Sequence, residues 1–263
     1  MTSDVLRFDD WTAPVRPVRR EVLSATRGAD DTRPPVLFVP GLGHGPWAFA
    51  EHWLAHTASR GYPAYAVGLR DDGDLRSYAH DVVQVAAGLP RQVVLVGHGA
   101  GALIVARALS RYPARAAVLV APVLDGWATL RAALRTNPFG TLPALVGGRL
   151  RLSRRQLFSP ALPVEQAQAY LDRLGRVGAR PRYQLVRQAV PGRPVGRPPT
   201  LVVGSPDDRV VPRASLDRTA GRYGVAPLLF PGMGHDLMLE PTWAEPIDAI
   251  MDWLDKELDT PRE

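Results

Sequence analysis

The sequence has 263 residues, 46% of them hydrophobic, and contains no cysteine. This length suits one or two domains with a sizeable hydrophobic core, and the lack of thiols excludes disulfides and cysteine metal sites. The formal net charge is +6. No helix-turn-helix, zinc-finger or aromatic–basic sheet motif accompanies this charge, so we expect no nucleic-acid partner.

The start of the chain and its apolar runs bear on location. The first ten residues include acidic side chains and lack the apolar stretch of a signal peptide. No apolar run approaches the roughly 18 residues that a membrane helix needs. We therefore expect a cytoplasmic protein that does not insert into a membrane.

Short apolar runs alternate with helical patterns along most of the chain, which is typical of βαβ units and a parallel sheet. An N-terminal antiparallel pair is expected over Leu6–Asp10 and Val15–Ser24. The strands expected after it are Val36–Val39, Ala64–Leu69, Gln92–Val96, Ala116–Val120, Thr200–Val203 and Pro227–Phe230. The helices expected between and after these strands are Trp47–Ser59, Ser77–Gly88, Ala100–Arg111, Arg213–Arg222 and Trp243–Leu258.

The alternation stops between Pro122 and Pro199. A turn-rich stretch, Pro191 to Pro199, indicates the return to the core. We therefore predict an α/β core domain made of residues 1–121 and 199–263, interrupted by a helical cap over residues 122–198. The helical patches expected in the cap are Trp127–Arg135, Leu142–Leu150, Val164–Leu174 and Tyr183–Ala189.

The basic residues concentrate in this predicted cap. Between Arg131 and Arg197 the sequence holds 13 arginines against two acidic residues, Glu165 and Asp172, a net charge of +11. A solvated arginine-rich surface is the simpler interpretation. The functional interpretation is that this segment faces an anionic ligand or an acidic carrier domain.

The segment Val93-Val94-Leu95-Val96-Gly97-His98-Gly99-Ala100-Gly101 is the most informative stretch. It has the frame of a nucleophile elbow, G-x-S-x-G, in which a strand meets a helix at a strained turn. Gly99 stands where that motif has its serine. Because glycine adopts strained dihedral angles more readily than serine, we expect the turn to persist without the attacking oxygen. Acyl-enzyme chemistry through residue 99 is therefore excluded.

A glycine-rich segment, Val39-Pro40-Gly41-Leu42-Gly43-His44-Gly45, follows the first buried strand. Such a turn exposes backbone N–H groups at the edge where open α/β sheets bind ligands. The N–H of Leu42, together with that of Ala100 at a helix start, would form an oxyanion hole.

An acid and a histidine follow the elbow in the chain order nucleophile, acid, histidine. Asp207 and Asp208 come after the strand Thr200–Val203, where a carboxylate can orient an imidazole. Their spacing does not separate them, and we expect one to orient the histidine and the other to be solvated or to cap the next helix. His235 lies on a glycine-rich loop after the last strand, and we expect it to be the catalytic base.

Four further residues are candidates for substrate binding. His44 and His98 flank the predicted site, although a histidine that hydrogen-bonds the backbone is the simpler interpretation of each. Trp47 and Trp127 would line an aromatic-binding pocket, whereas aromatic residues at such spacings more often belong to a core. The three histidines match no metal-ligand spacing, and the G-H-G-A-G segment lacks the pattern of a dinucleotide site, so we expect neither a metal nor another cofactor.

These blocks together resemble the α/β-hydrolase superfamily, and more narrowly its small esterase, hydroxynitrile-lyase-like and MenH-like enzymes. The resemblance rests on PGLGHGPWAF, GYPAYAVGLR, VVLVGHGAGALIVARAL, AVLVAPV, LVVGSPDDRVVP and FPGMGHDLMLEPTW, which lie within the region Pro35 to Leu254 and almost entirely outside the cap. It implies an α/β-hydrolase fold with a mostly parallel central sheet, flanking helices and an inserted helical cap. It also implies a triad with its nucleophile at position 99, its acid at position 207 or 208 and its base at His235. The glycine at position 99 departs from that pattern.

Three functions fit this departure. The leading hypothesis is a non-hydrolytic enzyme in which an Asp–His pair and an oxyanion hole transfer protons, for C–C bond formation, conjugate addition, cyclisation or elimination. The GC-rich codon usage implied by the composition favours an actinobacterial natural-product pathway, of polyketide type. The alternatives are a hydrolase in which His235 activates water and a ligand-binding protein without turnover. In each case we expect a small-molecule ligand, aromatic or anionic, and the sequence does not indicate an oligomeric state.

Overall fold

The computed structural model describes residues 15–28, 32–71, 73–187 and 191–259. A seven-stranded sheet lies at its centre, in the order β1-β3-β2-β4-β5-β6-β7. Neighbouring strands run parallel, except that β1 is antiparallel to β3. The strands are β1 (Val22–Ala25), β2 (Val36–Val39), β3 (Ala64–Val67), β4 (Val94–His98), β5 (Ala116–Val120), β6 (Thr200–Gly204) and β7 (Leu228–Leu229).

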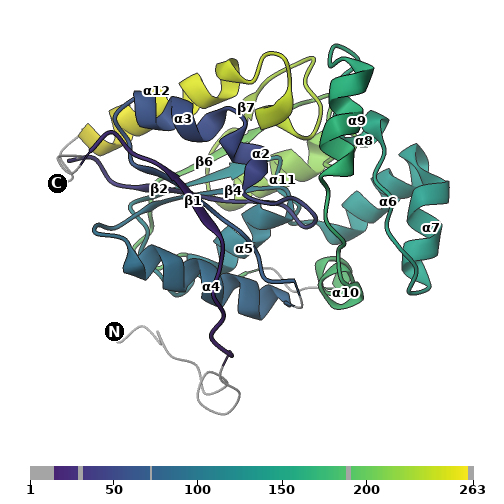
Figure 1. Cartoon of the computed structure of the whole chain (residues 1–263), viewed down its shortest axis with the longest axis horizontal. Coiled ribbons are helices and arrows are strands. Elements are labelled where there is room, and N and C mark those ends of the chain that lie inside the picture. The colour runs from purple at the N-terminus through teal and green to yellow at the C-terminus, as the bar shows by residue number, and fades with distance from the viewer. Residues whose placement is uncertain (1–14, 29–31, 72, 188–190, 260–263) are drawn as a thin grey trace.

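The central strands β2, β4, β5 and β6 are buried along their whole length. Strands covered on both faces read as continuous apolar runs, which is why they are recognisable in the sequence. Helices cover both faces of the sheet (Figure 1). The core helices are α2 (Trp47–Ala50), α3 (Trp53–Ser59), α4 (Leu75–Gly88), α5 (Ala100–Ala108), α11 (Arg213–Arg222) and α12 (Ala244–Asp259), with a short 3-10 turn, η1 (Leu237–Leu239).

Alternate residues of β2 point to opposite faces of the sheet, and each face packs against its own layer of helices. Val36 and Phe38 pack into the cluster that includes residues of α2, α3 and α12. Leu37 and Val39 pack into the opposite cluster, with residues of α4, α5 and α11. The predicted α/β architecture with a mostly parallel sheet is therefore confirmed.

Several predicted elements differ in detail. The helix expected over Trp47–Ser59 is divided into α2 and α3, because His52 leaves the helical region (φ −140°). The strand expected over Pro227–Phe230 shortens to β7, since Pro227 has no N–H for the ladder. At the N-terminus, Leu6–Asp10 lies outside the described residues, and β1 pairs with β3.

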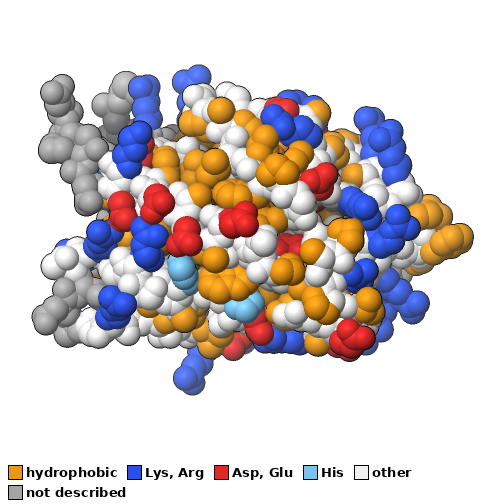
Figure 2. Space-filling view, turned by 90° about the horizontal axis from the view of Figure 1, so that it is seen from above, with side chains coloured by type: hydrophobic (Ala, Val, Ile, Leu, Met, Phe, Trp, Pro, Cys, Tyr) orange, Lys and Arg blue, Asp and Glu red, His pale blue; other side chains and the backbone are white. Residues whose placement is uncertain are grey.

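Among the described residues, five helices belong to the segment predicted as a cap, and Figure 1 shows them together beside the sheet. The predicted patches lie within or overlap four of them, and α8 was not expected. On the face shown in Figure 2, arginine side chains gather at the end of the molecule where these helices lie. These cap helices are α6 (Gly126–Thr136), α7 (Pro138–Leu145), α8 (Arg154–Leu157), α9 (Val164–Asp172) and α10 (Ala179–Arg187).

Among the described helices, none combines the length and the apolar character that a membrane crossing requires.

Candidate active site

The carboxyl ends of four parallel strands meet at one edge of the sheet, as in other open α/β sheets that bind ligands there. The glycine-rich loop follows β2, the elbow follows β4, Asp208 follows β6, and the His235 loop follows β7. The topology thus brings together segments that lie far apart in the sequence.

The elbow is a sharp turn at a single residue. β4 ends at His98, α5 begins at Ala100, and Gly99 between them has φ 56° and ψ −120°. Residues with a Cβ rarely adopt this left-handed φ. The backbone of Gly99 is held from both sides: its N–H donates to the carbonyl of Val120, and its carbonyl accepts from Val123 N–H.

Two glycines beside the elbow allow the strand and helix to approach each other. A Cβ on Gly97 would lie 2.6 Å from the carbonyl oxygen of Gly101, and a Cβ on Gly101 would lie 2.3 Å from that of Val39. Both distances are far below van der Waals contact. Position 99 therefore has its conformation imposed by the close packing of β2, β4 and α5.

His235 and Asp208 form a buried pair. The Nδ1–H of His235 donates to Oδ2 of Asp208 at 2.8 Å, and their side chains are 5% and 1% exposed. Burial lowers the pKa of His235, but the charge of Asp208 outweighs that effect and raises the pKa above its ordinary value. This bond fixes Nε2 as the ring atom that is available for proton transfer.

Asp207, the other acid of the motif, has a different contact. Its Oδ2 accepts a hydrogen bond from the N–H of Gly232 at 2.7 Å, and this carboxylate is outside the His235 pair. Asp208 also accepts, through Oδ1, from the N–H groups of Val210 and Val211. The two adjacent aspartates thus have different partners in the loop after β7, and only Asp208 contacts the imidazole.

The free ring nitrogen of His235 faces the elbow. A Cβ built on Gly99 would lie 3.1 Å from Nε2 of His235. That contact is slightly tighter than ordinary packing, so the imidazole stands close to the space that a side chain at position 99 would need. His235 and the turn at Gly99 therefore have the placement that the base and the nucleophile of a triad need, with no hydroxyl between them.

Two backbone donors lie beside this space. Leu42 and Ala100 both line the cavity in front of Gly99 and His235. Within the described part of the chain, neither N–H has a hydrogen-bond acceptor in the protein. Ala100 is the first residue of α5, where the helix dipole adds to the partial positive charge. Both donors suit a developing oxyanion.

A second buried cluster lies behind the first one. Nε2 of His44 donates to Oδ2 of Asp236 at 2.9 Å, and Nε2 of His98 donates to the carbonyl of His235 at 3.2 Å. Burial, together with the nearby charge of His235, lowers the pKa of His98 to about 3, so that this ring is neutral. Burial raises the pKa of Asp236, but the surrounding histidines outweigh it and lower the pKa below its ordinary value.

This cluster is also the group of side chains that comes nearest to a metal site. His44, His98 and Asp236 offer ligand atoms within 4.8 Å of one another. The Nε2 atoms of the two histidines already donate hydrogen bonds, to Asp236 and to the carbonyl of His235, and their Nδ1 atoms have no partner within the described residues. A metal bound through Nε2 would displace these hydrogen bonds and leave each Nδ1–H without the acceptor that a metal-binding histidine usually has.

Glu240 and Asp236 hold the histidine loop, and the sequence pattern predicts no role for either of them. The buried carboxylate of Glu240 accepts from the N–H of Gly234 and from the N–H and hydroxyl of Ser159. The N–H of Asp236 donates to the carbonyl of Leu157. Two acids within the otherwise apolar run after His235 were the available signal, since an acid in such a run needs a buried partner.

The cavity in front of the His235–Asp208 pair has a volume of about 130 Å³. We call it the catalytic cavity. It is lined by Gly99, His235 and both proposed oxyanion donors, and by His44 and His98. Neither predicted aromatic contact is part of its lining: Trp47 stacks on Tyr170 and His44, and Trp127 lines a separate hollow among the cap helices.

Comparison with known proteins adds to this geometry. The model of the alpha/beta hydrolase family matches residues 36–250. No curated protein sequence matches the chain. Similar solved structures include a monoacylglycerol lipase from Paleococcus ferrophilus, with a TM-score of 0.67 and 18% identity over 92% of this chain and 100% of that one.

Two further structures have the same likeness. An esterase from Rhodococcus sp. has a TM-score of 0.65 and 20% identity, over 90% of this chain and 94% of that one. A monoglyceride lipase variant from Saccharomyces cerevisiae has a TM-score of 0.69 and 13% identity, over 92% of this chain and 98% of that one. Identities this low show a shared fold alone. Because the family model covers most of the chain, and the sheet, elbow and histidine loop have the arrangement described above, the protein belongs to the alpha/beta hydrolase family.

Proposed function

We propose that this protein is an enzyme in which His235 acts as a general base directly on a small-molecule substrate. The observation that carries the proposal is the position of its Nε2, 3.1 Å from the point where a Cβ on Gly99 would stand. In an acyl-enzyme mechanism that nitrogen takes the proton of a serine hydroxyl. With glycine at position 99, the nitrogen faces the cavity, and the nearest acidic proton is one that the substrate brings.

The chemistry follows from the groups around His235. Asp208 holds the ring with Nδ1 protonated and stabilises the imidazolium that forms when Nε2 takes a proton. A proton removed from a carbon beside a carbonyl leaves its electron pair on the substrate, and that pair moves to the carbonyl oxygen. The N–H groups of Leu42 and Ala100 would stabilise the resulting enolate.

The enolate can react further without any group from the protein. Its carbon can attack a second carbonyl or a conjugated double bond, which gives C–C bond formation, cyclisation or conjugate addition, or it can expel a leaving group in an elimination. The imidazolium of His235 then returns the proton. Loss of a side chain at position 99 widens the floor of the cavity for a flat substrate. Together with the composition, this suggests a natural-product pathway of polyketide type as the setting.

A second candidate is a hydrolase in which His235 activates water. The volume of the catalytic cavity, about 130 Å³, exceeds the roughly 30 Å³ that one water occupies in the liquid. Several similar structures are lipases and esterases. General-base help without a covalent intermediate gives about 10²–10⁴-fold acceleration, so this candidate requires a reactive ester or lactone.

Binding without turnover is the least favoured function. A buried, oriented Asp–His pair costs stability through desolvation, and a pocket that only binds a ligand has no need of it. The pair beside an accessible cavity therefore supports catalysis.

Proton exchange tests the proposal directly. The purified protein is incubated in D₂O with a panel of enolisable ketones, including 2-tetralone, and exchange beside the carbonyl is followed by NMR. We expect exchange that is lost in His235→Ala and kept in Asp207→Asn, the control acid outside the pair. Exchange no faster than in His235→Ala for every ketone would overturn the proton-transfer role.

A parallel assay on 4-nitrophenyl acetate and butyrate separates the candidates. Hydrolysis that depends on His235, without any ketone exchange, would favour the water-activating hydrolase. No activity in either assay, together with tight binding of the ketones, would favour binding without turnover.

A further inference from the structure

Three hollows meet at the active site. The first is the catalytic cavity. The second, which we call the cap chamber, has a volume of about 560 Å³ and lies among α6, α7 and α10. The third, which we call the vestibule, has a volume of about 1060 Å³ and lies between the segment 147–154, α9 and the segment 174–182. Arg182 and Leu150 line all three.

The cap chamber is apolar. The side chains of Trp127, Leu130, Leu145 and Leu185 line it, and Leu185 also lines the catalytic cavity. Its volume is in the range of pockets that hold drug-sized ligands. Trp127 is 57% exposed, so its ring offers contact area to a ligand that enters the chamber. A flat apolar or aromatic body suits this space.

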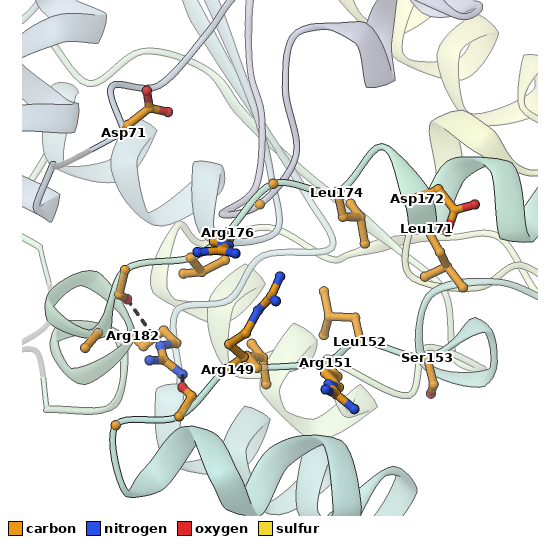
Figure 3. A pocket seen from close by; sticks show the side chains of 18 of the residues that line it. Asp71, Arg149, Arg151, Leu152, Ser153, Leu171, Asp172, Leu174, Arg176 and Arg182 are labelled. Atoms are coloured by element: carbon orange, nitrogen blue, oxygen red, sulfur yellow. Dashed lines mark hydrogen bonds between the residues drawn. The ribbon is translucent and has the colours of Figure 1, made fainter.

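The vestibule has the opposite character. Figure 3 shows Arg149, Arg176 and Arg182 around it, with Arg149 extending toward its centre. Five of its lining residues are arginines, and two are aspartates. Arg149 and Arg176 are exposed, and neither forms an ion pair with a described carboxylate. The positive potential of this hollow therefore remains largely uncompensated.

Arg182 stands where the apolar and the basic hollows join. Its Nε donates to the carbonyl of Gly178, and its Nη1 donates to the carbonyls of Ala144 and Gly148, the latter at 2.8 Å. Within the described part of the chain, Nη2 has no hydrogen-bond partner and the guanidinium has no carboxylate partner. Three carbonyls thus fix a half-buried cation in place without neutralising it.

We propose that Arg182 binds a carboxylate on the substrate, while the apolar body of the same molecule occupies the cap chamber. The guanidinium is pre-oriented by its carbonyl contacts, and Nη2 is free to donate to an anion. Because the two hollows and the catalytic cavity share Arg182, such a molecule would lie with its remaining end near His235. This assignment of the substrate class, an apolar or aromatic carboxylic acid, deepens the function proposed above and rests on it.

Ligand binding tests the assignment without any turnover. The probes are 2-naphthoate and its neutral isostere 2-naphthamide, and their dissociation constants are measured by titration calorimetry at low salt. We expect the wild-type protein to bind 2-naphthoate roughly tenfold or more tightly than 2-naphthamide, the effect of one charge-assisted hydrogen bond. Equal affinity for the two probes would overturn the proposal, and this result needs no variant.

Two matched variants locate the charge. Arg182→Gln should weaken 2-naphthoate roughly tenfold or more and leave 2-naphthamide unchanged. Arg180→Gln is the control, because Arg180 lies on the same helix, pairs with Asp74 and lines none of the three hollows. If Arg182→Gln weakens both probes alike, Arg182 shapes the chamber and does not bind the anion, and the proposal is wrong.

The result of the binding titration does not depend on the proton-transfer role proposed for His235, because the titration measures affinity and not turnover. Selective binding without ketone exchange would leave this inference standing and remove the proton-transfer role. Ketone exchange without selective binding would support the proton-transfer role of His235 and overturn the assignment of Arg182.

Discussion

Gly99→Ala tests the geometry on which the proposed chemistry rests. The φ of 56° and ψ of −120° at this position are unfavourable for any residue with a Cβ, and such strain costs about 1–3 kcal/mol. The added methyl would also lie 3.1 Å from Nε2 of His235. We therefore expect the free energy of unfolding to fall by about 1–3 kcal/mol.

Two other glycines separate the parts of this cost. Gly224 has φ 70°, and a Cβ added there would meet no atom within 4 Å, so Gly224→Ala reports the backbone cost alone, about 1–2 kcal/mol. Gly221 lies in α11 with the same open surroundings and without a left-handed φ. Gly221→Ala should stabilise the protein by about 0.5–1 kcal/mol, because glycine is a poor helix residue.

Urea unfolding of the three variants and the wild type measures these differences. For a chain of this size, each kcal/mol also moves the thermal midpoint by roughly 2–4 °C. The expected order of stability places Gly221→Ala above the wild type and Gly99→Ala at or below Gly224→Ala. A Gly99→Ala protein as stable as Gly221→Ala would refute the strained turn.

Gly99→Ser carries the same backbone cost and adds a hydroxyl beside the base. His235 must shift by a few tenths of an ångström to admit the new Cβ. We expect weak hydrolysis of 4-nitrophenyl acetate, absent from Gly99→Ala and lost again in a Gly99→Ser, His235→Ala double variant. No gain in a folded Gly99→Ser protein would refute the inference that the N–H groups of Leu42 and Ala100 form an oxyanion hole here.

Three further predictions concern the charges around the site. Asp208→Asn should lower the catalysed rate about 10²-fold or more, and Asp207→Asn should leave it unchanged. Since Asp208 raises the pKa of His235, the wild-type rate should rise with pH through a midpoint above 6.5, which a pH–rate profile checks. Glu240→Gln should cost about 1–3 kcal/mol in urea unfolding, because its carboxylate accepts three hydrogen bonds; an unchanged midpoint would contradict that role. The pKa of His98 in the folded protein is about 3, so below pH 6.5 the unfolded chain binds one more proton at this residue than the folded chain does. The free energy of unfolding should therefore fall by about 1.4 kcal/mol for each unit by which the pH is lowered. His98→Gln should reduce this slope between pH 4 and 6, and equal slopes would contradict the neutral buried ring.

The sheet and the position of the turn can be read from the order of residues alone. Central strands in a covered sheet must be apolar throughout, so β2, β4, β5 and β6 are visible as runs. The elbow is visible for a similar reason, since Gly97 and Gly101 have backbone atoms where a Cβ would stand. The contact of Gly97 with Gly101 acts between near neighbours in the chain and so leaves a local pattern, whereas the contact of Gly101 with Val39 joins the helix start to a distant strand.

The packing of distant segments decides which of the two aspartates contacts His235, and what surrounds that pair of residues. Asp207 and Asp208 are adjacent and chemically alike, and the path of the chain after β6 directs one to Gly232 and the other to His235. The pairing of His44 with Asp236 joins residues 192 positions apart. Such contacts depend on how separate loops pack against one another, and nothing in the order of residues along either loop records the partner. The same holds for Arg182, whose place between an apolar and a basic hollow exists only once the cap helices have assembled.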